Sequence, residues 1–230
     1  MRPFKVSQPI SELREVYPEG VKLIDVAKRV DDAELNSIAR LWLSEGIPYA
    51  FKEIPALYES IRSWIGAQLN VHPKEITLIG SARLGSSTVP KKLGKIFDPS
   101  SDLDWSIISE VLFDKCCVEF STWRKDFECG VVKPRNTNEK MYWDDNLDSC
   151  QNTIKRGFID PYKIPTWHRY PLSRLIADTM WRVKARSEKT DGAPQFCKAT
   201  LRVYRNWRCF VKQMVINLGH AAKVHSRNFR

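Results

Sequence analysis

Two aspartates next to an apolar segment are the residues of this chain best suited to chemistry. Asp102 and Asp104 flank Leu103 and lead into an apolar run that ends at Ile108. In a strand, alternate side chains share a face, so the two carboxylates would lie on one face about 6.6 Å apart. Like charges at that spacing repel each other, and a divalent cation such as Mg²⁺ would relieve the repulsion. The pair therefore predicts a metal site for phosphoryl chemistry, with two solvated acids on an exposed edge strand as the alternative.

A glycine-serine turn precedes the aspartates and has the composition of a phosphate-binding turn. Residues 76–79 form a short, β-branched apolar run that leads directly into this turn. Glycine permits close approach of the backbone, and a serine hydroxyl with neighbouring amides can cradle phosphate oxygens. Each feature alone is also common in solvated loops. Together they predict nucleotide-binding roles for five residues: Gly80, Ser81, Arg83, Lys91 and Lys92.

In this order, the elements resemble the DNA polymerase β-like nucleotidyltransferase superfamily. The matching residues are 78–85 (Leu-Ile-Gly-Ser-Ala-Arg-Leu-Gly) and 101–104 (Ser-Asp-Leu-Asp). A Pro-Lys-Lys-x-Gly segment at 90–94 makes the chain similar to an uncharacterised bacterial branch of that superfamily. The resemblance covers residues 76–108, under a sixth of the chain. It implies that the Gly-Ser turn holds a triphosphate and that the two aspartates bind Mg²⁺ or Mn²⁺.

The third carboxylate of the superfamily has no clear equivalent in this sequence. Active members place it on a later strand, where it completes the metal site and takes a proton from the attacking hydroxyl. We assign that role to Asp160, which follows the apolar pair Phe158-Ile159, although Pro161 directly after it favours a turn. The other candidate acids for this role lie in segments with helical periodicity: Glu119 in one, and Asp144, Asp145 and Asp148 in another. Without a third acid, the protein would bind a nucleotide but turn it over poorly.

Composition narrows the choice of partners and location. Lys and Arg number 37 against 27 Asp and Glu, which gives a formal net charge of +10 and favours polyanionic partners. The six cysteines show no paired-ligand spacing and are expected to be reduced thiols. No apolar run approaches the roughly 20 residues that a membrane span needs, and the N-terminal residues do not read as a signal peptide. We therefore expect a cytoplasmic protein without a membrane partner.

Hydrophobic periodicity predicts the elements that position these residues. The expected fold class is α/β (α+β), with a short mixed sheet of the polymerase β-like type and helices before, between and after the strands. We expect a helical part at 1–70, a nucleotidyltransferase core at 71–165, and a helical part with a basic tail at 166–230. Strands are predicted at 76–79 and 101–108, helices at 32–44, from Pro55 to 69, 110–128, 142–156, 172–187 and 205–222, and irregular structure with one short element at 1–30.

Cations alternate with aromatic residues near the C-terminus, in a segment that includes Tyr204, Trp207 and Phe210. One interpretation is a surface on which acceptor bases stack while cations follow phosphates. The other is an amphipathic helix whose aromatics face the core.

The sequence thus predicts a metal-dependent transfer of NMP from an NTP to a hydroxyl acceptor. The positive charge favours RNA or another nucleotide as the acceptor, with a protein hydroxyl or a small molecule also open. A role in phage defence or as a toxin follows only from the resemblance. The alternatives are a non-catalytic nucleotide- or nucleic-acid-binding module, and a subunit that binds a protein partner.

Overall fold

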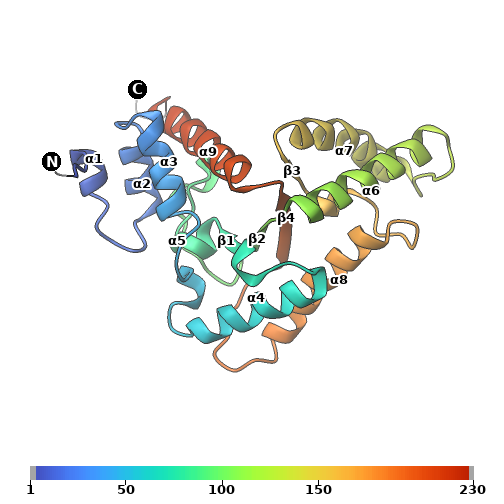
Figure 1. Ribbon diagram of the computed structural model, residues 1–230, viewed down its shortest axis with the longest axis horizontal. Coiled ribbons are helices and arrows are strands. Elements are labelled where there is room, and N and C mark those ends of the chain that lie inside the picture. The colour runs from blue at the N-terminus through green and yellow to red at the C-terminus, as the bar shows by residue number, and fades with distance from the viewer. Residues whose placement is uncertain (1–3, 228–230) are drawn as a thin grey trace.

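A mixed β-sheet lies between two groups of helices (Figure 1). The computed structural model describes residues 4–227. The strand order is β1-β2-β4-β3; β2 and β4 run parallel, whereas the β1–β2 and β4–β3 pairs are antiparallel. The strands are β1 (Ile76–Ile79), β2 (Leu103–Ile108), β3 (Phe158–Ile159) and β4 (Ala199–Tyr204).

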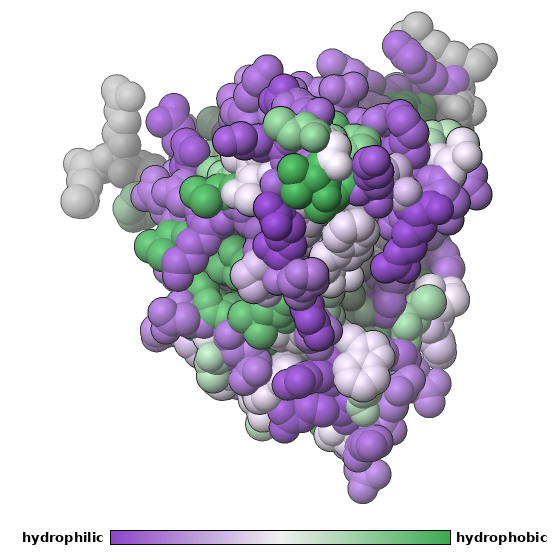
Figure 2. Space-filling view, turned by 90° about the vertical axis from the view of Figure 1, so that its right-hand side faces the viewer, coloured by the Kyte–Doolittle hydropathy of each residue, from purple (hydrophilic) through white to green (hydrophobic). Residues whose placement is uncertain are grey.

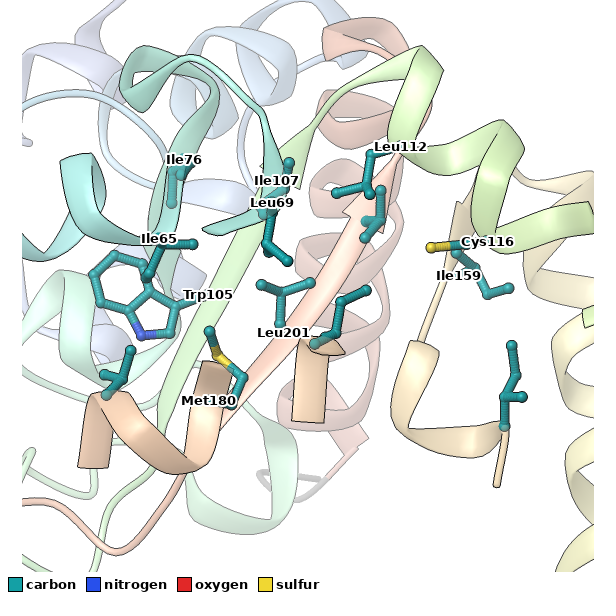
Figure 3. Close-up of a cluster of buried hydrophobic side chains, with 14 of the residues drawn as sticks. Ile65, Leu69, Ile76, Trp105, Ile107, Leu112, Cys116, Ile159, Met180 and Leu201 are labelled. Carbon is teal, nitrogen blue, oxygen red and sulfur yellow. The ribbon is translucent and has the colours of Figure 1, made fainter. Parts of the chain in front are cut away.

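One face of the sheet packs against a large apolar core. Alternate residues of the strands point into this core, with Trp105 of β2 and Leu201 of β4 almost completely buried. Figure 3 shows side chains from the covering helices converging on these strands. The Trp105 ring stacks on Tyr58, with 5.9 Å between ring centroids. The helices of this group are α4 (Pro55–Leu69), α6 (Glu110–Glu128), α7 (Thr137–Lys155) and α8 (Pro171–Ser187).

The opposite face of the sheet is covered over only part of its area. Ile108, Phe158 and Tyr204 belong to a second apolar cluster with the helices on that side, whereas Asp104 and Arg202 of the same face lie outside it. Figure 1 shows these helices grouped at one end of the molecule. They are α2 (Gly20–Ala27), α3 (Asp32–Leu41) and α9 (Trp207–Arg227).

Short elements join the longer ones and place the Gly-Ser turn. Helix α5 (Ser81–Leu84) begins directly after Gly80, at the end of β1. The loop that follows α5 is anchored to the N-terminal helices, because the Gly20 amide donates to Ser86 Oγ at 2.7 Å. The remaining elements are α1 (Gln8–Ser11) and the 3₁₀ turns at Tyr49–Phe51, Pro73–Glu75, Pro90–Lys92 and Pro161–Lys163.

The mixed α/β class and both predicted strands are confirmed, but one prediction near the C-terminus was wrong. The segment 166–230, expected to be helical, also supplies β4, so α9 begins at Trp207 and not at 205. Period-2 alternation of polar and apolar residues at 198–204 is the signal for this strand, and the aromatic-basic pattern obscured it. Helix α7 begins at Thr137, five residues earlier than predicted, because the Asn136 side chain accepts from the Glu139 amide and caps it.

Two further expectations concern the ends of the chain. Residues 1–30, expected to be mostly irregular, contain α1 and α2. The predicted basic tail continues α9 as far as Arg227, and residues 228–230 lie outside the described part of the chain.

The face formed on the α6–α8 side of the molecule is largely hydrophilic. Figure 2 shows hydrophilic residues over most of that face, with apolar residues in patches between them. Within residues 4–227, no helix is both long and apolar enough to span a membrane.

Helix α8 depends on a carboxylate from a different helix. Its N-terminal flanking residue, Tyr170, provides no side-chain cap. Instead, Glu119 of α6 accepts hydrogen bonds from the amides of Leu172 (2.8 Å) and Ser173 (2.7 Å), and from the Ser173 hydroxyl. Glu119 is only 9% exposed, so this contact ties the start of α8 to the core. Glu119 therefore has a structural role.

Removing this carboxylate should destabilise the protein. We expect Glu119→Ala to lower the free energy of unfolding by about 2 kcal/mol, because two helix-end amides lose their buried acceptor. Asp114→Ala, on the exposed side of the same helix, is the matched control and should change it by less than about 0.5 kcal/mol. Urea unfolding measures both. Equal stability of the two variants would contradict the capping role.

Candidate functional site

A pocket of about 770 Å³ lies around the first half of β4 and is lined by residues from both faces of the sheet. Its polar side chains come from three neighbouring strands, and one wall is formed by α8. This is the size range, roughly 300–1,000 Å³, in which proteins bind small ligands. Its polar and exposed aromatic lining residues include Asp102, Asp104, Asp160, Tyr162, Trp181, Lys198, Thr200 and Arg202.

The two predicted aspartates reach this pocket together. Leu103, between them, is completely buried in the core, so strand alternation turns both carboxylates to the opposite face. Asp102 lies at the rim, where 35% of its side chain is exposed and Lys198 Nζ is 3.9 Å from its Oδ2. Both acids therefore line the same pocket.

Asp104 lies deeper and is held by the next strand. Its register partner on β4 is Thr200, whose hydroxyl donates to Asp104 Oδ1 at 2.6 Å. Burial raises the pKa of the Asp104 carboxyl above its ordinary value, and the Thr200 hydrogen bond opposes that shift. A carboxylate that is costly to ionise gains from any cation that binds beside it.

The Gly-Ser turn meets Asp104 at the end of β1. Ile79 pairs with Asp104 across the β1–β2 ladder, so the next residue, Gly80, lies beside the carboxylate. A Cβ atom at Gly80 would lie 3.6 Å from Asp104 Oδ2. Gly80 also has φ of +70°, a conformation that favours glycine. Ser81 follows as the first residue of α5. The Gly-Ser turn and the Asp104 carboxylate are thus neighbours, and the binding of phosphate by this turn stays a prediction.

These residues offer oxygen ligands of the kind that Mg²⁺ prefers. Asp102, Asp104 and the Thr200 hydroxyl stand on adjacent strands around one opening. Within the described residues, no group of three or more His, Cys, Asp or Glu side chains has the geometry to hold a metal ion. The donor set fits a cation held by two carboxylates, with the remaining ligands coming from a phosphate or water.

Asp160, the predicted third acid, lines the pocket but is already paired. It is 3% exposed and directly follows β3. Both of its oxygens accept from Arg202 of β4, at 2.6 Å from Nε and 3.1 Å from Nη2. Strand β4 therefore lies between Asp160 and Asp104, and the residue opposite Asp104 is Thr200. A catalytic role for Asp160 stays a prediction.

None of the five residues predicted to bind nucleotide is among the pocket-lining residues, although Gly80 lies beside Asp104. Arg83 is 2% exposed and donates from Nε to the Trp42 carbonyl at 3.1 Å. Burial lowers the pKa of its guanidinium. Lys91 and Lys92 are exposed in the 3₁₀ turn of the following loop. Arg83 thus packs against the segment that follows α3, and the two lysines do not line the pocket that contains Asp104.

Several pocket residues were missed by sequence reasoning. Thr200 and Arg202 alternate along β4 and so share the face of Asp104, and Lys198 directly precedes this strand. That alternation was visible, but only the pairing with β2 turns it into a site. The predicted aromatic-basic surface divides: Tyr204 and Phe210 are completely buried, as the core alternative requires, while Trp207 is 44% exposed in a separate groove.

Two single substitutions should change stability in opposite directions. We expect Asp104→Asn to raise the free energy of unfolding at neutral pH, because a raised pKa means that ionised Asp104 disfavours the fold.

We expect Asp160→Asn to lower the free energy of unfolding by on the order of 2 kcal/mol, because Arg202 loses its counter-charge. This loss is smaller than the loss expected on breaking a fully buried ion pair, since part of the Arg202 side chain still reaches solvent.

Chemical denaturation of the two variants beside the wild type measures both effects. Asn keeps the size of Asp at each position, so packing changes little. A loss of stability in Asp104→Asn as large as that in Asp160→Asn would show that Asp104 is a structural ion-pair residue instead.

Comparison with known proteins leaves the pocket to be interpreted from its own residues. No family model matches the chain, no curated protein matches it, and no solved structure matches it.

Proposed function

We propose that the chain is a metal-dependent nucleotidyltransferase that moves an NMP from an NTP to a hydroxyl acceptor. The observation that supports this most is that the Gly80 turn lies next to the acids: a Cβ atom at Gly80 would be 3.6 Å from Asp104 Oδ2, and Asp104 lines the same pocket as Asp102. Transfer of a phosphoryl group requires positioning and charge neutralisation more than covalent chemistry from the protein. A backbone turn and two convergent acids meet that requirement.

Each residue has a distinct task in this proposal. Asp102 and Asp104 hold Mg²⁺ or Mn²⁺, which when bound neutralises phosphate charge and lowers the pKa of an acceptor hydroxyl. Thr200 fixes the orientation of the Asp104 carboxylate through Oδ1, and Oδ2 faces the Gly80 turn. Lys198 lies beside Asp102 at the rim, where a cation would attract an anionic substrate.

The acceptor is inferred from charge. With a net charge of +10, the protein should attract RNA or a second nucleotide more strongly than a cationic small molecule. Roles in phage defence or as a toxin, and a cytoplasmic location, stay predictions.

A second candidate is nucleotide binding without transfer. It is favoured by the Asp160–Arg202 ion pair, because both oxygens of Asp160, the third pocket-lining carboxylate among residues 4–227, accept from Arg202. In that state Asp160 does not accept a proton from a hydroxyl. Asp160 acts as a base only if the ion pair opens when substrate binds.

A labelled-transfer assay distinguishes the two candidates. Purified protein is incubated with each labelled NTP, Mg²⁺ or Mn²⁺, and total RNA. We expect label to move to RNA or to a new nucleotide, and Asp102→Ala/Asp104→Ala to reduce this at least about 100-fold. The matched control is Asp145→Ala/Asp148→Ala, which removes two exposed carboxylates from α7 and should leave transfer unchanged.

The alternative results have separate meanings. Metal-dependent NTP binding without transfer would support the second candidate. Transfer that survives loss of Asp102 and Asp104 would overturn the proposed site.

A further inference from the structure

The wall of the pocket that α8 forms contains an exposed tryptophan. Trp181 of α8 has 70% of its surface exposed, although tryptophan is usually mostly buried. The pocket-lining residues of α8 follow helical spacing, so they form one stripe that faces the opening. They are Ile176, Ala177, Met180, Trp181 and Lys184. Met180 packs into the core beneath β4 (Figure 3), which holds the stripe against the sheet.

Trp181 is not explained by packing. Ile176 and Met180, on the same stripe, are 3% and 5% exposed, so α8 already has its apolar anchors. An indole left in water inside a pocket offers a flat apolar face to a ligand. Tyr162, which is 61% exposed in the turn after Asp160, adds a second ring to the same pocket.

The edge of β4 that faces away from β2 is only partly paired with a neighbouring strand. Strand β3 pairs only with Val203 and Tyr204, so along residues 199–201 the outer edge of β4 has no strand partner in the described chain. The Leu103 amide donates to the Lys198 carbonyl, which directs the backbone groups of Lys198 towards β2. Those of Ala199 and Leu201 therefore face the open edge, since these groups alternate along a strand in a parallel pair.

We propose that the pocket has a nucleobase subsite, in which the base stacks on Trp181 and turns its polar edge towards the open edge of β4. This rests on the proposed function: the phosphates lie at the Gly80 turn and the two aspartates, and the base occupies the part of the pocket that α8 forms. The pocket of about 770 Å³ has room for more than a triphosphate. Because every base has a flat face, stacking on Trp181 provides affinity without strong selection among bases.

The test compares two ligands that differ only in having a nucleoside. Binding of ATP and of inorganic tripolyphosphate, each with Mg²⁺, is measured by titration calorimetry. We expect Trp181→Ala to weaken ATP binding about 5- to 100-fold, the range for loss of one base–aromatic stack, and to leave tripolyphosphate binding within about twofold. Trp181→Phe should keep most of the ATP affinity.

Trp207→Ala is the matched control, because Trp207 is also an exposed tryptophan but lines a different groove. It should bind both ligands as the wild type does. Thermal unfolding checks that each variant is folded, and the exposure of Trp181 predicts little loss of stability.

The outcomes separate this inference from the proposed function. If wild-type protein binds both ligands and Trp181→Ala binds ATP equally well, the base subsite is overturned while the phosphate site stands. An equal loss for both ligands would also overturn it, because the effect would not depend on the base. If the wild type binds neither ligand, the proposed function and the subsite both fail.

Discussion

The burial of Leu103 and Trp105 in the core determines where the two aspartates point. Both apolar residues are completely buried, and strand alternation then forces Asp102 and Asp104 to the opposite face. A shift of β2 by one residue would expose the tryptophan and bury two carboxylates in the apolar core, so the register is strongly determined. The same register places Asp104 between Ile79 and Thr200, which brings the Gly-Ser turn and the β4 hydroxyl to it.

The pocket exists because the second face of the sheet is only partly covered. Helices α2, α3 and α9 pack on Ile108, Phe158 and Tyr204 and leave the polar half of that face open. Short β3 also leaves part of β4 without a neighbour. Helix α8, held at its start by Glu119, closes the pocket from the other side. A carboxylate in α6 thus supports the position of Trp181, although it lies outside the pocket.

The residues of the site that could be predicted from the sequence are those marked by a pattern within a few neighbouring residues. The Gly-Ser turn and the aspartates lie at the ends of apolar runs with period-2 alternation, so a short window of sequence identifies them. Thr200 and Arg202 join the site through a parallel pairing between segments almost 100 residues apart, and pairing over that distance leaves no local pattern. The ion pair of Asp160 with Arg202 depends likewise on strand pairing, here the antiparallel β3–β4 pair, between residues 42 positions apart. Trp181 resembles any exposed helical residue until α8 is placed beside β4.

The measurement that tests the central claim most directly is a crystal structure with Mn²⁺ and a non-hydrolysable NTP. The anomalous signal of manganese locates the ion independently of the protein ligands. We predict a peak beside the carboxylates of Asp102 and Asp104, with the triphosphate at the Gly80 turn. Nucleotide bound elsewhere, or manganese sites that exclude both aspartates, would contradict the assignment of this pocket as the functional site.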